Sequence, residues 1–236
     1  MQRSSSTPEL KRTIQPLRLK RMAFLLLATG IIFFVGMFLT QLTSTAPYSM
    51  SKQSISSLGV TTCGKFTEPQ THKVYDICSP LHLVMDGTFV ACGVLTFLAT
   101  QYGLRFMWPG RKQRTVGLTL LYIGGASEVM AGLFPVNVHP LTHSIGGGIA
   151  IASLNLALIF LGLAARKVRR KLGRLTLLWG IVGMIGFVLD GPPYPILGYG
   201  GWERVAGCAF PIWGLCVGGY WVYCTARTKT LSAAHG

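Results

Sequence analysis

The sequence predicts an all-α membrane protein, a polytopic bundle of six transmembrane helices. Of its 236 residues 50% are hydrophobic and only 12% are charged, and the mean hydropathy is +0.46. Soluble domains carry about a quarter charged residues, so these values exclude a cytosolic globular enzyme and a disordered chain. Six apolar stretches also approach the roughly 20 residues that a helix needs to cross a hydrocarbon core about 30 Å thick.

The six helices are expected where the apolar stretches lie, at residues 22–42, 79–102, 116–135, 142–165, 175–190 and 202–226. Helices are favoured over barrel strands because these stretches lack polar alternation, and because a backbone in lipid must satisfy its own hydrogen bonds. The fifth stretch is the shortest, so we expect it to extend into its flanks. The first follows a basic segment, as a secretory signal does, but its length indicates an uncleaved anchor.

This pattern predicts one transmembrane domain, residues 22–226, with a basic tail before it (1–21), a short tail after it (227–236) and a long loop near residues 43–77. Most of the 22 Lys and Arg residues fall in the two tails and in the loops after the second and fourth helices. Segments rich in these residues stay in the cytoplasm. We therefore expect both termini in the cytoplasm, in a multi-pass protein of the cell (plasma or inner) membrane.

The formal charge of +15 is accounted for by this topology signal and by attraction to anionic membrane lipids. Nucleic acid is not an expected partner, since the basic residues form no stripe with interleaved aromatic residues. Membrane lipids are the expected partners, and a homo-oligomer or a role as an accessory subunit of a larger membrane complex stays open. Glycines in the fifth and sixth helices allow close helix contacts, which favours packing within one chain over a homo-oligomer; the relevant residues are Gly180, Gly183, Gly186, Gly214 and Gly218.

The six cysteines divide by location. Cys63 and Cys78 lie in the long external loop, where an oxidising compartment permits a disulfide, so this pair is either bridged or free. The other four lie within predicted helices and are expected to pack as small apolar residues: Cys92, Cys208, Cys216 and Cys224.

Ionisable residues within or at the ends of the predicted helices all belong to the external half of the bundle. They are His82, Asp86, Glu128, His139, His143, Asp190, Glu203 and Arg204. Such residues are costly in a membrane and therefore indicate a functional site. Asp86 and Glu128 each lie on the order of 10 Å from the outer helix ends, so they could meet, and Arg204 could neutralise Asp190. Four carboxylates nevertheless exceed one arginine, so protons, histidinium, a metal or a cationic ligand must compensate.

The spacing of the histidines raises the question of a metal site. His82 and Asp86 are four residues apart, and so are His139 and His143, which places each pair on one helix face. Imidazole and carboxylate are ligands that Zn²⁺ uses. However, Pro140 suits the first helical position, which leaves His139 outside the helix. A bound zinc, a structural polar cluster and a ligand or head-group pocket all stay open.

Three short motifs occur in order along the chain: Ser-Ile-Ser-Ser-Leu-Gly at residues 54–59, Gly-Leu-Phe-Pro at 132–135 followed by His143, and Glu-Arg at 203–204. Together they resemble the family of bacterial and archaeal membrane proteins called domain of unknown function 998, which is distantly similar to the Frag1/DRAM/Sfk1 group. The resemblance covers about residues 22–226 and implies six helices. It implies no established reaction, cofactor or substrate, and it carries over Ser54, Ser57, Pro135, His143, Glu203 and Arg204.

These observations support three functional hypotheses, of which a non-catalytic one is favoured. In the first, an outward-facing pocket binds a lipid head group or an amphiphilic small molecule, and its residues are Ser54, Ser57, Asp86, Glu128, His143, Asp190, Glu203 and Arg204. In the second, a metal on His82, Asp86, His139 and His143 activates water for an intramembrane lipid hydrolase or transferase, with Glu128 as the general base. In the third, Asp86 and Glu128 relay protons in a small transporter.

Overall fold

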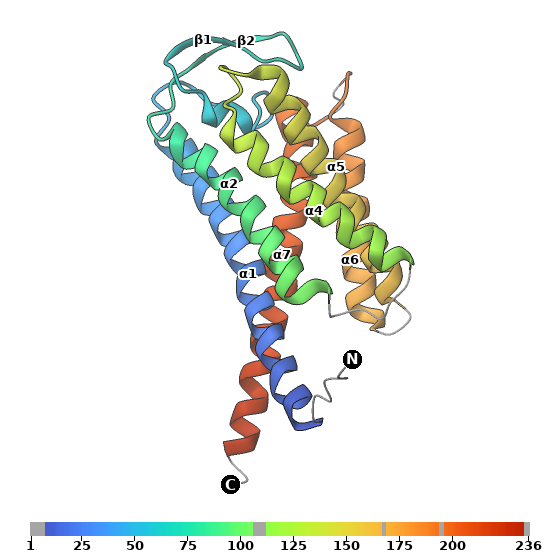
Figure 1. Cartoon of the computed structure of the whole chain (residues 1–236). Helices are drawn as coiled ribbons and strands as arrows, with labels where there is room; N and C mark the ends of the chain where they lie inside the picture. Colours follow the sequence, from blue (N-terminus) through green and yellow to red (C-terminus); the bar gives the residue numbers. More distant parts are fainter. Residues whose placement is uncertain (1–7, 106–111, 167–168, 194–195, 234–236) are drawn as a thin grey trace, which may run out of the picture.

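The computed structural model describes residues 8–105, 112–166, 169–193 and 196–233. Within these ranges, six helices are long and apolar enough to cross a membrane. They belong to α1 (Pro8–Leu42), α2 (His82–Ala99), α4 (Lys112–Leu133), α5 (Pro140–Ala165), α6 (Arg170–Leu189) and α7 (Tyr199–Ala233), shown in Figure 1. The prediction of an all-α, six-helix membrane protein is therefore confirmed.

The helix boundaries follow the sequence signals with three main differences, one of which is that α7 extends to Ala233, past the expected end at residue 226 and into the predicted tail. Helix α1 begins at Pro8, so part of the segment expected as a tail is helical. Helix α2 continues into a π-helical turn, η2 (Thr100–Leu104). Helix α6 begins at Arg170 and so extends into its flank, as expected for the shortest apolar stretch. Pro140 opens α5, with His139 at the N-cap position, as expected from its fixed φ.

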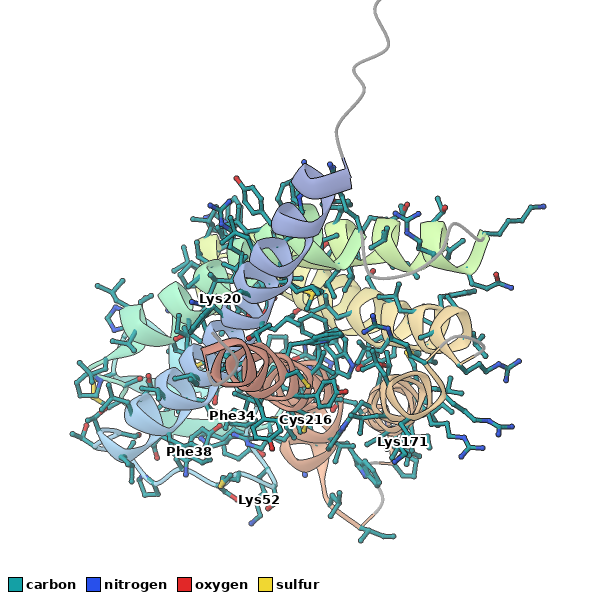
Figure 2. The ribbon with its side chains drawn as sticks, turned by 90° about the horizontal axis from the view of Figure 1, so that it is seen from below. Lys20, Phe34, Phe38, Lys52, Lys171 and Cys216 are labelled. Atoms are coloured by element: carbon teal, nitrogen blue, oxygen red, sulfur yellow. A yellow bond between two sulfur atoms is a disulfide. The ribbon has the colours of Figure 1, made fainter. Side chains whose placement is uncertain are left out.

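The six helices form a closed ring in which each packs against the next along the chain and α7 packs against α1. The start of α1 and the end of α7 lie at one end of the bundle (Figure 1). Figure 2 looks along the bundle from that end, and Phe38 of α1 and Lys171 of α6 lie on its outer surface. A closed ring leaves an interior that all six helices can line.

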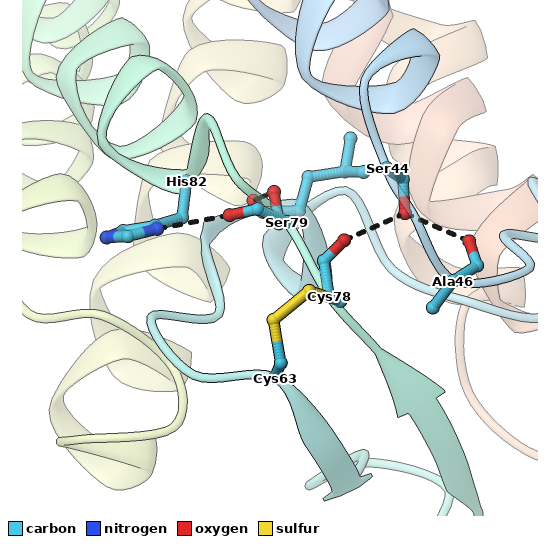
Figure 3. The surroundings of a disulfide bond; sticks show 7 residues. Ser44, Ala46, Cys63, Cys78, Ser79 and His82 are labelled. Atoms are coloured by element: carbon cyan, nitrogen blue, oxygen red, sulfur yellow. Dashed lines mark hydrogen bonds between the residues drawn. A yellow bond between two sulfur atoms is a disulfide. The ribbon is translucent and has the colours of Figure 1, made fainter.

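A cap segment, residues 43–81, lies at the opposite end of the ring (Figure 1). It contains a 3-10 turn, η1 (Ser56–Gly59), and two antiparallel strands, β1 (Gly64–Thr67) and β2 (Val74–Ile77), paired from Gly64↔Ile77 to Thr67↔Val74. A disulfide joins Cys63 and Cys78, the residues next to the first of these pairs (Figure 3). The disulfide therefore closes the base of the hairpin, beside the start of α2.

An apolar core fills the half of the ring nearer the start of α1. Its largest fully buried side chains are Trp213, Met22, Leu26, Leu104, Leu121, Leu158 and Leu161. Glycines bring the helices close here: a Cβ on Gly180 would lie 2.7 Å from the Ile159 nitrogen, and one on Gly218 would lie 2.7 Å from the Ala23 carbonyl oxygen. These contacts lie within one chain, which is the packing that the glycine pattern favours.

Candidate functional site

A cavity of about 270 Å³ occupies the ring interior at the cap end. All six spanning helices contribute to its wall, and the cap segment contributes Ile55, Ser56 and Gln70. Its deepest helical residues include Thr29 and Asn155, which lie about 20 Å along their helices from the cap end at a rise of about 1.5 Å per residue. The cavity thus reaches well into the membrane-spanning part of the bundle.

Three carboxylates from separate parts of the chain line this cavity: Glu128 of α4, Asp190 after α6 and Glu203 of α7. Glu203 is buried and accepts a hydrogen bond of 2.7 Å from the Ile55 amide nitrogen. Glu128 Oε2 and Asp190 Oδ1 are buried, and neither has a hydrogen-bond partner among the described residues. Burial, together with the smaller effect of the nearby carboxylates of Glu203 and Glu68, raises the pKa of Asp190 to about 8.

His143 joins the cavity wall to the cap segment. Its Nδ1 lies 2.9 Å from the Ala131 carbonyl oxygen and 3.0 Å from that of Phe134, so this nitrogen carries the proton that it donates. Its Nε2 lies 2.8 Å from the Ser56 hydroxyl, which donates to it. Both ring nitrogens are therefore engaged within the protein, and no lone pair is left for a metal ion.

Arg204 holds the cap segment instead of reaching into the cavity. Its Nη1 donates to the carbonyl oxygens of Met50 at 2.8 Å, Gln53 at 3.0 Å and Gly200 at 2.8 Å, and its Nη2 donates to the Tyr48 hydroxyl. The sequence suggests that Arg204 neutralises Asp190, and this is corrected here, because its two outer nitrogens are taken by these four acceptors. Burial raises the pKa of Tyr48 to about 12, which keeps its hydroxyl neutral beside the guanidinium.

Ser54 and Ser57 lie in the cap segment and order its first turn. The Ser54 hydroxyl donates to Glu68, with oxygen distances of 3.1 and 3.0 Å, and accepts a 2.9 Å bond from the Ser57 amide. The Ser57 hydroxyl donates to the Ser54 carbonyl at 2.8 Å. Burial raises the pKa of Glu68. Neither serine lines the cavity, so their role in the structure is to shape the cap rather than to touch an occupant.

The four residues considered as metal ligands are not brought together. Among the described residues, no group of three or more His, Cys, Asp and Glu side chains is placed to hold a metal ion. His82 Nδ1 lies 3.1 Å from the Ser79 carbonyl oxygen (Figure 3), and the His139 ring packs edge-to-face on Phe134. Asp86 is buried against Gly59 and does not line the cavity, so it does not share the site of Glu128.

Two residues that sequence reasoning did not single out belong to this region. Glu68 is buried within the cap segment and accepts a hydrogen bond from Ser54, and Asn155 of α5 lines the cavity at 1% exposure. Glu68 lies in a predicted loop, where a carboxylate is expected to be solvated, so the sequence gives no sign of its burial. Asn155 could have been found, because an amide in the middle of an apolar helix is costly unless it is paired.

Comparison with protein families places the chain. Residues 26–220 match a family described as "Protein of unknown function (DUF998)". The chain belongs to this family. Comparisons with curated proteins and with solved structures gave no match. The family resemblance expected from the short motifs is thereby confirmed, while the similarity to the Frag1/DRAM/Sfk1 group stays a prediction.

Proposed function

We propose that this membrane protein binds an amphiphilic small molecule, or the head group of a lipid, in the cavity beneath its cap and carries out no chemistry on it. In this proposal the termini lie in the cytoplasm, the cap lies outside and the membrane is the cell (plasma or inner) membrane. The positive-inside distribution of Lys and Arg supports this orientation.

The observation that carries the proposal is that the acidic side chains of the cavity lie near the cap, whereas the deeper wall is mostly apolar, with Thr29 and Asn155 as its polar exceptions. Acidic side chains, among them Asp190 and Glu203, line it near the cap, whereas Phe33, Leu154 and Phe210 line it deeper in the bundle. A mostly apolar pocket with a few convergent polar groups is the usual form of a small-molecule site. An amphiphile fits with its polar group near the cap and its hydrocarbon part toward the apolar core.

A cavity-filling variant tests this proposal. Gly148 lines the cavity, and a Cβ built on it meets no atom within 4 Å, so Gly148→Leu adds bulk to the space without a backbone clash. Gly219 of α7 has equally open surroundings but does not line the cavity, which makes Gly219→Leu the matched control. Native mass spectrometry of detergent-purified protein should show retained amphiphile in the wild type and in Gly219→Leu, and its loss in Gly148→Leu. Equal retention by all three proteins would contradict the proposal.

A second candidate, a serine hydrolase, is favoured by one specific contact. The Ser56 hydroxyl lies 2.8 Å from His143 Nε2 while Nδ1 is held by carbonyl oxygens, which is the geometry of a nucleophile with an oriented base. The surroundings oppose it. A tetrahedral oxyanion needs backbone N–H donors, but the Ile55 amide is taken by Glu203 and the Ser57 amide by Ser54. The carboxylates of the cavity would also repel the developing negative charge.

A fluorophosphonate probe separates the two candidates. Covalent labelling of the wild type that is lost in Ser56→Ala would favour the hydrolase. Labelling at the same background level in both proteins would favour binding without catalysis. Ser49→Ala serves as the matched control for labelling, because Ser49 is a half-buried serine of the cap whose hydroxyl contacts that of Ser51.

A further inference from the structure

The cavity beneath the cap carries acidic side chains without basic partners in the described part of its wall, and a bound cation would favour their ionised forms. Glu128, Asp190 and Glu203 line it, and no Lys or Arg is found among its described lining residues. The nearest arginine in sequence, Arg204, directs its outer nitrogens to the cap and to the Gly200 carbonyl. Charges held in a membrane interior are expensive unless an opposite charge or a proton compensates them. An occupant of this cavity therefore meets two carboxyl groups, those of Glu128 and Asp190, with no cationic neighbour among the described residues, whereas Glu203 has the charge of Arg204 near it.

Most hydrogen-bond donors in the wall are already used within the protein; the Gln70 side-chain amide, for example, donates to the Ser144 hydroxyl at 3.1 Å. Thr29 donates its hydroxyl to the Leu25 carbonyl at 2.9 Å, and the Asn155 amide nitrogen donates to the carbonyls of Ile151 at 2.9 Å and Ala206 at 3.0 Å. The His143 and Ser56 donors are also used inside the protein.

Acceptors, in contrast, are left over. Glu128 Oε2 and Asp190 Oδ1 are buried with no hydrogen-bond partner among the described residues, and Asn155 Oδ1, which also lacks one, lies against Gly183 of α6. Asn155 is 1% exposed and Glu203 is 7% exposed, so these are groups of the interior and not of a solvated rim. Pro211 lines the cavity within α7, and because proline has no N–H, the Gly207 carbonyl, also in the wall, loses its helical donor. A wall with unpaired acceptors, in which most donors are already used, favours an occupant that supplies hydrogen-bond donors or a positive charge.

Aromatic rings complete the surroundings. Five aromatic side chains from four helices line the cavity: Phe33, Phe89, Phe187, Tyr199 and Phe210. The faces of such rings attract cations, and ammonium groups are commonly bound by aromatic walls combined with carboxylates. The same rings offer a poor environment to phosphate or sulfate, whose charge repels both the ring faces and the carboxylates.

The volume limits the size of the occupant. About 270 Å³ equals the share of roughly nine liquid waters at about 30 Å³ each, and it lies just under the range of about 300–1,000 Å³ usual for drug-sized ligands. A whole two-chain phospholipid is too large, whereas an ammonium group with part of one hydrocarbon chain is not.

We infer that the cavity binds a single-chain amphiphile whose head is a cationic ammonium group, with the head held by Glu128, Asp190 and Glu203 and the chain lying against Phe33 and Phe210. This inference rests on the proposed function and narrows it to one class of ligand. Arginine side chains often bind phosphate groups, but Arg204 instead bonds the carbonyl oxygens of the cap and has a structural role there.

The test uses three probes with the same tail and different heads, added to the full-length protein in a maltoside detergent. Dodecyltrimethylammonium is cationic, dodecyldimethylamine N-oxide is neutral and of similar size, and dodecyl sulfate is anionic. Affinities follow from the dependence of the melting temperature on probe concentration. We expect the cation to bind at least about tenfold more tightly than the N-oxide, a difference of about one unit in log K.

Two charge-neutralising variants provide the matched comparison. Glu128→Gln should remove most of the preference for the cation, whereas Asp76→Asn, which removes one negative charge from the exposed surface of β2, should leave it unchanged. If the N-oxide binds as tightly as the cation and both are blocked by Gly148→Leu, the cationic inference is overturned and the proposed function stands. If no probe binds and Gly148→Leu behaves as wild type, both are overturned.

Discussion

Arg204 is a side chain of α7 that holds the cap segment, together with Glu203, which accepts a hydrogen bond from the Ile55 amide, so Arg204→Ala tests how the cap is kept over the cavity. The guanidinium donates to two cap carbonyls, those of Met50 and Gln53, and to the Tyr48 hydroxyl. Its bond to the Gly200 carbonyl lies within α7 and does not cross to the cap. Replacement by alanine removes all the crossing bonds of Arg204 at once.

The size of the effect follows from the two carbonyl bonds alone. Hydrogen bonds to charged groups contribute about 1.5–3 kcal/mol each. The Met50 contact is exposed and the Gln53 contact is partly buried, so we take the lower value for both, which gives about 3 kcal/mol. At about 1.4 kcal/mol per tenfold change, the opening equilibrium of the cap increases about 150-fold.

Hydrogen–deuterium exchange of cap peptides covering residues 48–55 measures this opening directly. Amide exchange there should accelerate about 100-fold or more in Arg204→Ala, given the estimate of about 3 kcal/mol. Lys52→Ala removes an exposed cation from the same segment and should leave exchange unchanged. An acceleration of less than about threefold in Arg204→Ala, or an equal one in Lys52→Ala, would refute the assignment of Arg204 as the clamp.

Three further predictions concern pH, the disulfide and topology. Burial raises the pKa of Asp190 from 3.8 to about 8, so between these pH values the folded protein holds a proton that the unfolded chain releases. The contribution of this group to the free energy of unfolding therefore falls as the pH rises from about 4 to about 8. The melting temperature should consequently depend less on pH in Asp190→Asn than in wild type or in the control Asp76→Asn. Replacing Cys63 and Cys78 by Ser opens a loop with a sequence separation of 15, which should lower the stability of the cap by about 3 kcal/mol. Trypsin should then cut the cap faster at Lys65 or Lys73, whereas Cys216→Ser, which removes a free cysteine, should not change the rate of cutting. A membrane-impermeant amine reagent should label Lys65 and Lys73 in intact cells but Lys171 only after permeabilisation, and the reverse pattern would exclude cytoplasmic termini.

The helices could be predicted from the sequence because length and apolarity decide them. A run such as residues 22–42 has few alternatives in a bilayer, where the backbone must bond to itself. Helix ends were also signalled locally, as at Pro140, which opens α5 with His139 as its N-cap. The apolar runs and the helix start at Pro140 depend only on residues close together in the chain, so they can be recognised from one sequence.

The cap and the membership of the site depend on contacts between distant segments. Strands β1 and β2 have four residues each, too short for a clear alternation of polarity. Asp86 and Glu128 lie at similar depths, yet only Glu128 faces the cavity, because the rotation of each helix is decided by its packing. The involvement of Ile55, whose amide bonds Glu203 across 148 positions of the chain, has no local signal at all.

The ring closes between its first and last members, since α7 packs against α1. The chamber beneath the cap therefore does not exist on a nascent chain until the sixth span has entered the membrane. Until then, the helix of Glu128 lacks some of its neighbours, and the hydrogen bonds from Ile55 to Glu203 and from Arg204 to Met50, which hold the cap segment, cannot form. Assembly of the site is consequently a late event of biogenesis, and a chain terminated after α6 would reach the bilayer as an open ring of five helices with an acidic side exposed to lipid.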